Sequence, residues 1–347
     1  KFFGGRAQEV EKRTKVKARV VAHALENLIK ESNKVMIMGH SNPDIDAMGS
    51  AMGIYRLVKE LGKNAYIITS NETNTLQSFK ESLLKDPEYE DILITKEVAE
   101  ENIDETTLLV VVDTNKVNYV ESPDILTKTD KIVVIDHHRR SADYIENATL
   151  TFQEVYASSA AELVTEILQY VSIKINLKTI EAESLYAGIM MDTKNFTFKT
   201  GVRTFEAAAY LRKCGVDIIR VKKWFQSDLA SFNKIAEIVK KAEIVNDSIA
   251  IASYNRKTKD ASLICAKAAD ELLTISNITA SFVLGNIGDK ICISGRSIGD
   301  INVQIILEKL GGGGHITLAG AQLEGLTMEE AKQELIIRIN EYFTEIE

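Results

Sequence analysis

The sequence contains little cysteine, and its apolar runs are short. Its three cysteines, Cys214, Cys265 and Cys292, are far apart and form no Cys-x-x-Cys motif, which is the pattern of free thiols in a reducing compartment. The longest apolar runs, such as residues 108–112, have the length of a strand. A membrane-spanning helix needs roughly 18 or more consecutive apolar residues, and the sequence shows neither such a run nor a secretory signal peptide.

The chain also lacks a surplus of positive charge. It has 42 Lys and Arg residues against 50 Asp and Glu residues, which gives a formal net charge of −8. Proteins that bind long nucleic acids usually have a positive surplus, because neutralising phosphates supplies most of their affinity. The charge balance therefore argues against a long nucleic-acid partner, whereas a small anionic ligand needs only a few local cations.

The length of 347 residues is sufficient for two domains. Short apolar runs alternate with helical patterns, which predicts an α/β fold with a mainly parallel sheet flanked by helices. We assign 1–31 to a connector helix at the end of an upstream domain, 32–228 to this first domain, and 229–347 to a smaller α/β domain. Residues 203–243 are predicted to be helical and to contain the linker. Because the chain begins with Lys1 rather than Met, we expect it to be part of a longer protein.

Titratable side chains follow the predicted strands of the first domain. Ligands bind beyond the carboxyl ends of the strands in such sheets, and titratable groups are costly to bury after an apolar strand unless they bind something. One aspartate has a structural alternative, because Asp46 also fits the N-cap of the next helix. The candidate residues are His40, Asp44 and Asp46 on one loop, Asp113, the run Asp136-His137-His138, and Asp192 at the end of an apolar helix.

The chemistry of these side chains favours metal ions. They comprise about five carboxylates and two to three imidazoles, with no thiolate. Such ligands suit Mn²⁺, while Mg²⁺, Co²⁺, Zn²⁺ and Fe²⁺ stay open on chemical grounds. The set exceeds the needs of one ion, and two ions about 3.5–4 Å apart form the usual clamp for phosphoester hydrolysis. The residues therefore predict a phosphodiesterase with two metal ions.

A glycine run in the second domain is a candidate for contacts with an anionic substrate. One glycine of the run is expected to cap the helix before it, and the others would let backbone N–H groups approach an anion. Arg296 can pair with phosphate or stack on a base, whereas a surface position is an open alternative for Arg203. Ser158 and Ser159 predict a helix N-cap, with a ligand contact as the second alternative. The candidate substrate-binding residues are Arg203, Arg296, Gly311, Gly312, Gly313, Gly314 and His315.

In their order along the chain, these motifs resemble those of the DHH phosphoesterase family, which is named after the run Asp136-His137-His138. The second domain resembles the DHH-associated domain through residues 294–297 and 311–315. The resemblance implies that Asp136 orients an imidazole from outside the ligand shell and that His138 contacts substrate phosphate or supports the site. By the same resemblance the metal ligands are His40, Asp44, Asp46, Asp113, which bridges, His137 and Asp192.

Within the family, the chain resembles the catalytic part of GdpP-type cyclic di-AMP phosphodiesterases. The opening Phe2-Phe3-Gly4-Gly5-Arg6 and the basic residues 10–15 resemble the junction in those proteins. This implies hydrolysis of cyclic di-AMP to the linear dinucleotide pApA, with two Mn²⁺ ions per chain. It further implies a homodimer on the cytoplasmic side of a membrane, anchored by segments upstream of these residues.

Other functions share the same residues. A nanoRNase or 3′-phosphoadenosine 5′-phosphate phosphatase of the family would have the same ligands and the same glycine run, and would act on related short nucleotides. A RecJ-like exonuclease is disfavoured by the acidic balance and the length, and a family II pyrophosphatase by the glycine run. A non-catalytic nucleotide sensor is a further alternative, although an intact ligand set argues against it.

Overall fold

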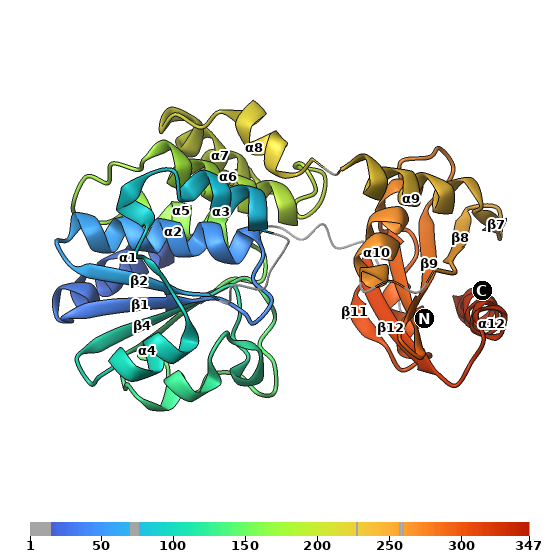
Figure 1. Ribbon diagram of the computed structural model, residues 1–347, viewed down its shortest axis with the longest axis horizontal. Helices are drawn as coiled ribbons and strands as arrows, with labels where there is room; N and C mark the ends of the chain where they lie inside the picture. Colours follow the sequence, from blue (N-terminus) through green and yellow to red (C-terminus); the bar gives the residue numbers. More distant parts are fainter. Residues whose placement is uncertain (1–14, 70–75, 227, 257, 259, 347) are drawn as a thin grey trace. The chain divides into compact units, whose positions relative to one another are not determined.

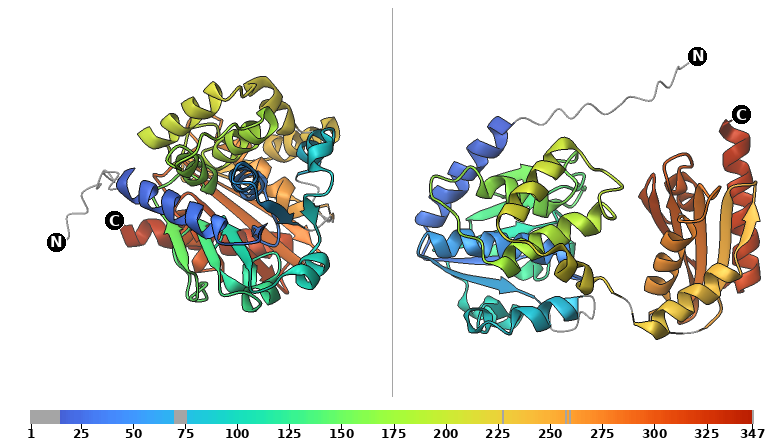
Figure 2. Two further views of the ribbon diagram at one scale, coloured as in Figure 1. Left: turned by 90° about the vertical axis from the view of Figure 1, so that its left-hand side faces the viewer. Right: turned by 90° about the horizontal axis from the view of Figure 1, so that it is seen from above.

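We analysed a computed structural model that describes residues 15–69, 76–226, 228–256, 258 and 260–346. The chain forms two compact units, which divide between Phe225 and Gln226 (Figures 1 and 2). No helix in these described ranges is long and apolar enough to cross a membrane. The opening motif at residues 2–6 and most of the basic stretch after it lie outside the described residues.

The first unit is built on a six-stranded sheet in the order β3-β2-β1-β4-β5-β6. Every neighbouring pair of strands is parallel, so the predicted α/β fold with a mainly parallel sheet is confirmed. The strands are β1 (Lys34–Met38), β2 (Asn64–Ile68), β3 (Leu93–Ile94), β4 (Thr107–Val112), β5 (Ile132–Asp136) and β6 (Leu150–Gln153).

Apolar side chains on both faces of this sheet pack against helices and loops. Val35 and Ile37 of β1 belong to one cluster of buried side chains, and Met36 and Met38 belong to a second cluster, as expected when successive side chains alternate in direction. Figure 1 shows α2, α5 and α6 on one face and α4 on the other. The helices are α1 (Lys15–Lys30), α2 (Ile45–Glu60), α3 (Gln77–Leu83), α4 (Lys96–Asn102), α5 (Ala160–Leu168), α6 (Thr179–Asp192), α7 (Val202–Lys213) and α8 (Ile218–Trp224).

The helical stretch predicted for residues 203–243 is broken into three helices. The chain turns at Gly215 with φ of +99° after α7. Two aspartates that accept hydrogen bonds as N-caps, Asp217 and Asp228, then begin α8 and α9. The prediction of one stretch was wrong because it overlooked Gly215 and these capping aspartates.

The second unit has a mixed six-stranded sheet in the order β11-β12-β10-β9-β8-β7, in which only the β8–β9 pair is parallel among the described pairs. α9 and α10 pack on one face, and α11 and α12 pack on the other. The elements are α9 (Leu229–Lys240), β7 (Glu243–Val245), β8 (Ile249–Tyr254), α10 (Ala261–Leu272), β9 (Ala280–Ile287), β10 (Lys290–Ser297), α11 (Val303–Glu308), β11 (Gly313–His315), β12 (Leu318–Glu324) and α12 (Met328–Ile346).

A buried carboxylate on α1 provides a test of how this helix is held. Ser172 N donates to Glu26 Oε2 at 2.8 Å, and Lys30 Nζ lies 2.5 Å from Glu26 Oε1. Burial opposes ionisation, but the hydrogen bonds from Lys30 and Ser172 together outweigh it and lower the pKa of Glu26 to about 2. A pKa lowered from 4.5 stabilises the fold above that pH, and the stabilisation is lost as the pH falls towards 2.

We therefore expect Glu26→Gln to lower the free energy of unfolding of the first unit by about 1 kcal/mol at pH 7. The difference in unfolding free energy between Glu26→Gln and the unaltered chain should shrink as the pH falls from 5 to 3. The chain has a single tryptophan, Trp224, whose ring lies 5.3 Å from that of Phe79 in the first unit, so urea unfolding followed by its fluorescence reports this unit alone. A difference that stayed constant with pH would contradict the role of the ionised carboxylate.

Candidate metal centre

The parallel sheet brings three of the predicted motifs to one edge. β1, β4 and β5 are neighbours, and their registers align Met38 with Val111 and Val112 with Ile135. Their carboxyl ends therefore meet, and the residues that follow them are placed side by side. His40 follows β1, Asp113 follows β4, and His137 follows β5, while α6 ends at Asp192.

The predicted metal ligands come together in this place. His40 Nε2 lies 3.5 Å from Asp113 Oδ2 and 3.9 Å from Asp44 Oδ1. His137 Nε2 lies 3.3 Å from Asp113 Oδ1 and 3.1 Å from Asp192 Oδ2. Three sets of ligand atoms, each with all atoms within 4.8 Å of one another, can be drawn from these side chains: His40, Asp44 and Asp113; Asp46, His137 and Asp192; and Asp113, His137 and His138.

Buried polar atoms in the cluster are consistent with bound cations. Asp113 Oδ1, His40 Nδ1 and both ring nitrogens of His137 are buried without a well-aligned hydrogen bond among the described residues, although His137 Nε2 lies within ion-pair distance of two carboxylates. Such atoms are costly to bury unless they find a partner. Asp113 presents Oδ2 to His40 and Oδ1 to His137, so its carboxylate is placed to bridge two ions. Oxygen and nitrogen donors without sulfur fit the metal ions expected from the sequence.

The charges of the cluster are also those expected of a site that binds cations. Burial alone would lower the pKa of His40, but the carboxylates of Asp113 and Asp44 raise it to about 10. The pKa of His137 is also raised against the effect of burial, by Asp113 and Asp192. Burial and the neighbouring carboxylates raise the pKa of Asp46. The crowding of carboxylates in the cluster therefore favours positive charge beside them, which a bound metal ion would also supply.

Asp46 has a different structural role from the one considered from the sequence. The N-cap of α2 is Asp44, whose Oδ1 accepts from the backbone N of Asp46 at 2.9 Å and of Ala47 at 3.1 Å. Asp46 lies in the first turn instead, and its carboxylate accepts from the N–H groups of Ala160 and Ala161, at 2.8 and 2.9 Å. The N-cap alternative for Asp46 was therefore wrong. Its carboxylate is fixed by the N-terminus of α5, whose own N-cap is Ser159, as predicted.

The Asp136-His137-His138 run divides its side chains between two tasks. His137 enters the cluster, whereas Asp136 is fully buried beside it, and its Oδ1 lies 2.8 Å from His138 Nδ1. Burial would raise the pKa of Asp136, but hydrogen bonds from His138 and Asn115 hold it below its usual value. The ionised Asp136 is an acceptor only, so His138 donates its Nδ1–H, and its ring orientation is fixed. Nothing in the sequence pattern had singled out Asn115.

A second contact that the sequence did not reveal involves Tyr119. The ring of Tyr119 is stacked on that of His40, with centroids 5.2 Å apart and planes at 5°. The backbone supports this arrangement, since Ser41 N donates to the carbonyl of Tyr119 at 2.8 Å. The stacking restricts the rotation of the His40 ring within the cluster. An aromatic residue with neither helical nor strand periodicity around it gives no sequence signal for such a role.

In the second unit, Arg296 and His315 lie on one face of the sheet. Each pairs with Leu318 of β12, Arg296 from β10 and His315 from β11, and residues directly opposite in antiparallel strands point to the same face. Arg296 Nε donates to Asp270 Oδ1 at 2.9 Å, and its Nη1 donates to the Gly295 carbonyl at 2.9 Å. These bonds use two of the five N–H donors of the guanidinium.

The glycine run serves the fold at three of its four positions. Gly311 has φ of +76°, and its N–H and that of Gly312 donate to the carbonyls of Glu308 and Leu307, which caps α11 as predicted. A Cβ would lie 2.2 Å from the Gly320 carbonyl oxygen at Gly312, and 2.4 Å from the Leu318 oxygen at Gly314. Gly313 has no atom within 4 Å of such a Cβ, so the fold does not require a glycine there.

Comparison with known proteins decides the family. Residues 34–189 match the DHH family, N-terminal domain, and residues 246–345 match the DHHA1 domain. The chain belongs to the DHH family. The resemblance inferred from the motifs is thereby confirmed, and the two matches fall in the first and second units respectively.

Curated relatives of the whole chain are also found. The chain is 45% identical over 346 residues to the cyclic-di-AMP phosphodiesterase GdpP of Geobacillus thermodenitrificans, and 42% identical over 348 residues to the cyclic-di-AMP phosphodiesterase PdeA of Listeria monocytogenes. Each match covers 99% of this chain and 53% of the relative, so the chain spans about half the length of these relatives. The bifunctional oligoribonuclease and PAP phosphatase NrnA of Thermus thermophilus is more distant, at 25% identity over 94% of this chain and 95% of NrnA.

Among solved structures, an exopolyphosphatase-related protein from Bacteroides fragilis has the same fold. It superposes with a TM-score of 0.81 at 22% sequence identity, covering 93% of this chain and 96% of that chain. At this identity the match supports the fold of the DHH protein and not its substrate.

Arg203 of the DHH domain is not a surface residue. Its side chain is 9% exposed and pairs with Glu166 of α5, so the solvated alternative considered from the sequence was wrong. The pair joins α7 to α5, which gives Arg203 a structural contact within the domain. Its part in substrate binding stays a prediction.

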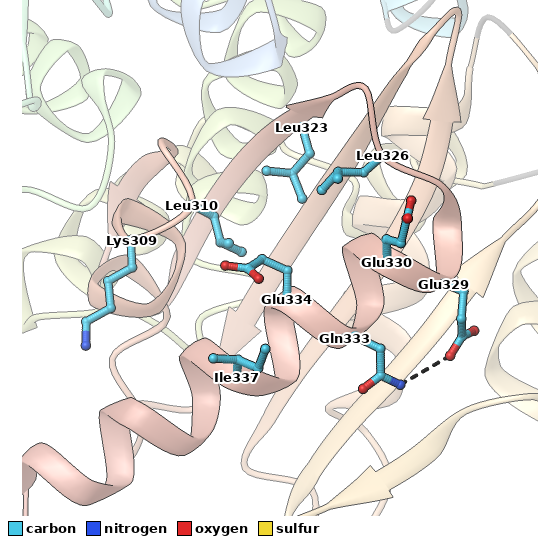
Figure 3. A pocket seen from close by; sticks show the side chains of 9 residues that line it. All are labelled: Lys309, Leu310, Leu323, Leu326, Glu329, Glu330, Gln333, Glu334 and Ile337. Atoms are coloured by element: carbon cyan, nitrogen blue, oxygen red, sulfur yellow. Dashed lines mark hydrogen bonds between the residues drawn. The ribbon is translucent and has the colours of Figure 1, made fainter.

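A groove of about 640 Å³ lies on the DHHA1 domain, lined by residues of α12, β12 and the end of α11 (Figure 3). Leu310, Leu323, Leu326 and Ile337 supply apolar side chains, and the helix contributes several glutamates. None of the predicted substrate-binding residues lines this groove. We therefore do not assign it to the site.

The position of Asp136 leads to a prediction for the DHH domain. Asp136→Asn keeps the size of the side chain but removes the charge that orients His138. We expect a loss of roughly 10–100-fold in Mn²⁺ affinity or in activity, the usual effect of altering a group that supports a metal ligand. Activity should be titrated with Mn²⁺, because saturating metal would conceal a loss of affinity. Wild-type behaviour at limiting Mn²⁺ would reduce Asp136 to a structural residue.

Proposed function

We propose that the chain hydrolyses cyclic di-AMP to the linear dinucleotide pApA at a centre of two divalent metal ions. The observation that carries this proposal is the set of ligand groups at the carboxyl ends of β1, β4 and β5, joined through Asp113 and His137. The relatives named cyclic-di-AMP phosphodiesterases support the substrate, because they are 42–45% identical across 99% of the chain. We take Mn²⁺ as the metal on the basis of the oxygen and nitrogen donors.

The side chains divide into two sets, and Asp113 lies between them, because one of its oxygens is near His40 and the other is near His137. His40 and Asp44 would hold one ion, and His137 and Asp192 would hold the other together with Asp46. The ions would supply Lewis acidity, activating water and offsetting the charge of the phosphodiester. Asp46 keeps its orientation through Ala160 and Ala161, and His40 keeps its orientation through Tyr119, so the ligands are held in place before ions bind.

His138 is placed for the substrate rather than for the interior of the cluster. Its side chain is 44% exposed, and its Nδ1–H is directed to Asp136, so its Nε2 is the atom that a phosphate oxygen can approach. When Nε2 carries a proton it can donate to that oxygen. Asp136 thus acts through His138, and His138 acts on the phosphodiester.

The DHHA1 domain is proposed to bind the rest of the substrate. Arg296 has N–H donors without a hydrogen-bond partner among the described residues, on the face that it shares with His315, and no atom lies within 4 Å of a Cβ at Gly313, which leaves space for an anion beside it. A guanidinium can pair with phosphate or stack on adenine. Gly311, Gly312 and Gly314 shape the loop, and Arg203 is the next candidate for a substrate contact.

The experiment that tests the proposed function is a hydrolysis assay with the chain in Mn²⁺. The substrates are cyclic di-AMP, cyclic di-GMP, pApA and 3′-phosphoadenosine 5′-phosphate, with products separated by chromatography. We expect cyclic di-AMP to give the highest kcat/KM, and pApA to accumulate. Preference for pApA or for 3′-phosphoadenosine 5′-phosphate would assign the chain to the NrnA type of activity. Binding of cyclic di-AMP without turnover of any substrate would indicate a sensor.

Two further properties belong to this proposal. We place the chain on the cytoplasmic side of a membrane, as the catalytic part of a longer protein anchored by segments upstream of it, and we propose that it forms a homodimer. Light scattering of the purified chain tests the second point directly. A mass of about 38.6 kDa, which is that of one chain, would reject the dimer.

A further inference from the structure

Asn115 lies two residues after Asp113, on the loop that follows β4, with 4% of its surface exposed. Its Nδ2 donates to Asp136 Oδ2 at 2.5 Å and to the carbonyl of Arg139 at 3.3 Å. Its Oδ1 accepts from the backbone N and the Oγ of Ser141, both at 3.1 Å. Both N–H donors and both lone pairs of the amide are therefore in use.

These partners determine which way round the amide lies. A flipped amide would place Oδ1 against the ionised carboxylate of Asp136, and it would place the two N–H donors against the backbone N–H of Ser141. Both contacts would be repulsive, because an ionised carboxylate only accepts and a backbone N–H only donates. The donor is therefore held facing Asp136, and Asn115 cannot exchange this bond for another without losing its contacts with Ser141.

The bond to Asp136 controls the direction of a second bond. Asp136 Oδ1 lies 2.8 Å from His138 Nδ1 and accepts from the His138 backbone N at 3.1 Å, whereas Asn115 is the donor to Oδ2 among the described residues. The two oxygens of a carboxylate share one plane. A donor fixed on Oδ2 therefore fixes the rotation that points Oδ1 at the His138 ring. The Nδ1 atom of this ring lies 3.7 Å from Asp113 Oδ1.

We propose that Asn115 is a positioning residue of the metal centre, which holds the Asp136 carboxylate in the plane that directs His138 beside Asp113. This role rests on the proposed function in one respect, namely that the cluster binds divalent ions. The hydrogen bond from Asn115 thus links the loop after β4 to the end of β5, and it supports the metal centre from one residue beyond Asp136. Loss of the Asn115 amide is then expected to act on the metal centre through Asp136 and not independently of it.

The test is a double-mutant cycle on the full chain, with Mn²⁺ affinity measured by calorimetry and kcat/KM measured on cyclic di-AMP. Asn115→Ala should lower both by about 10-fold, the lower end of the range for groups that support metal ligands. In a chain that already carries Asp136→Asn, the same change should cost less than threefold, because residues in one network are not additive. Asn115→Ser keeps a hydroxyl donor, so it should recover part of the Mn²⁺ affinity.

Two controls separate positioning from a general loss of stability. Ser141→Ala removes one donor to Asn115 Oδ1 but keeps the bond to Asp136, and it should leave Mn²⁺ affinity within twofold. Thr129→Val deletes a buried hydroxyl that donates to the Thr107 carbonyl at 2.8 Å elsewhere in the DHH domain. It should lower the thermal midpoint and leave Mn²⁺ affinity unchanged.

Normal Mn²⁺ affinity in folded Asn115→Ala would overturn the proposal. So would losses that multiply in full when Asn115→Ala and Asp136→Asn are combined, since Asn115 would then not act through Asp136. If Asn115→Ala does not fold, Asn115→Ser gives the same comparison. These outcomes leave the proposed function standing, whereas an unaltered chain that bound no divalent ion would overturn both.

Discussion

Replacing Asp113 is expected to abolish the hydrolysis of cyclic di-AMP while the DHH domain stays folded. Its carboxylate lies 3.5 Å from His40 Nε2 and 3.3 Å from His137 Nε2, so the change removes a ligand from both ion positions. Stabilisation of phosphoryl charge by metal ions is worth several kcal/mol, which corresponds to about 10³-fold or more in rate. His137→Ala should have the same effect, because His137 also belongs to two of the ligand sets.

The choice of variant matters at this position. Asp113 has φ of +60°, in the left-handed region that asparagine tolerates better than alanine does. Asp113→Asn therefore removes the charge with little strain, and it should unfold in urea close to the unaltered chain when Trp224 fluorescence is followed. Elemental analysis should find about two Mn²⁺ per unaltered chain and fewer in Asp113→Asn.

An exposed carboxylate outside the ligand sets provides the matched control. Asp124→Ala removes one negative charge from the surface of the DHH domain and should retain metal content and turnover. Near-normal hydrolysis by Asp113→Asn and by His137→Ala would reject the assignment of the cluster. Loss of hydrolysis with full metal content would move these residues from metal binding to another task in the reaction.

The sequence located this cluster because of one property of parallel sheets. The apolar runs that become β1, β4 and β5 each end at a titratable residue, and the alternation with helices implies parallel strands. Parallel neighbours have their carboxyl ends on one edge, so residues as far apart as His40 and His137 were predicted to meet. Asp192 was a weaker candidate, because the end of a helix does not by itself point to that edge.

The supporting contacts could not be predicted in the same way. Asn115 bonds Asp136 across 21 residues, and Asp46 accepts from Ala160 across 114 residues, so no local pattern records either contact. The two aspartates near α2 differ in role because the backbone at Asp44 is extended, with ψ of −171°, while Asp46 is already inside the helix. A sequence reading cannot decide between N-cap positions two residues apart.

The strand β11 was missed for a related reason. Glycine is depleted in strands, so Gly313 and Gly314 gave no strand signal, and the run was interpreted as a loop. In the structure Gly312 and Gly314 lie so close to the backbone of β12 that no larger residue fits. The strand β11 therefore forms because its backbone can lie close to that of β12, which is a tertiary contact, and not because its residues favour strands.

A substitution in the DHHA1 domain is expected to weaken substrate binding without touching the metal. Arg296→Ala should lower the affinity for cyclic di-AMP by roughly 10–150-fold, the equivalent of losing a charged hydrogen bond worth about 1.5–3 kcal/mol. Every proposed metal ligand precedes residue 193, so Mn²⁺ content should be unchanged. Arg338→Ala, on α12, changes another arginine of the same domain and should bind cyclic di-AMP normally.

Arg296 also pairs with Asp270, so a second variant must separate substrate binding from local packing. Gly313 serves this purpose, because an added Cβ meets no atom within 4 Å and its φ is not in the left-handed region. Gly313→Val should therefore leave the domain folded, while its side chain blocks the approach of an anion to the backbone. A loss of cyclic di-AMP affinity at unchanged thermal midpoint would assign the loop to the substrate.

The nature of the substrate completes the comparison. Bis(p-nitrophenyl) phosphate is a phosphodiester without bases, so it should lose less activity than cyclic di-AMP does in Arg296→Ala and in Gly313→Val. The DHH domain alone, ending near residue 225, should still bind Mn²⁺ but should hydrolyse cyclic di-AMP poorly. Equal losses on the two substrates would contradict the proposed division between metal centre and substrate-binding domain. Retained cyclic di-AMP affinity in Arg296→Ala would make Arg203 the next residue to replace.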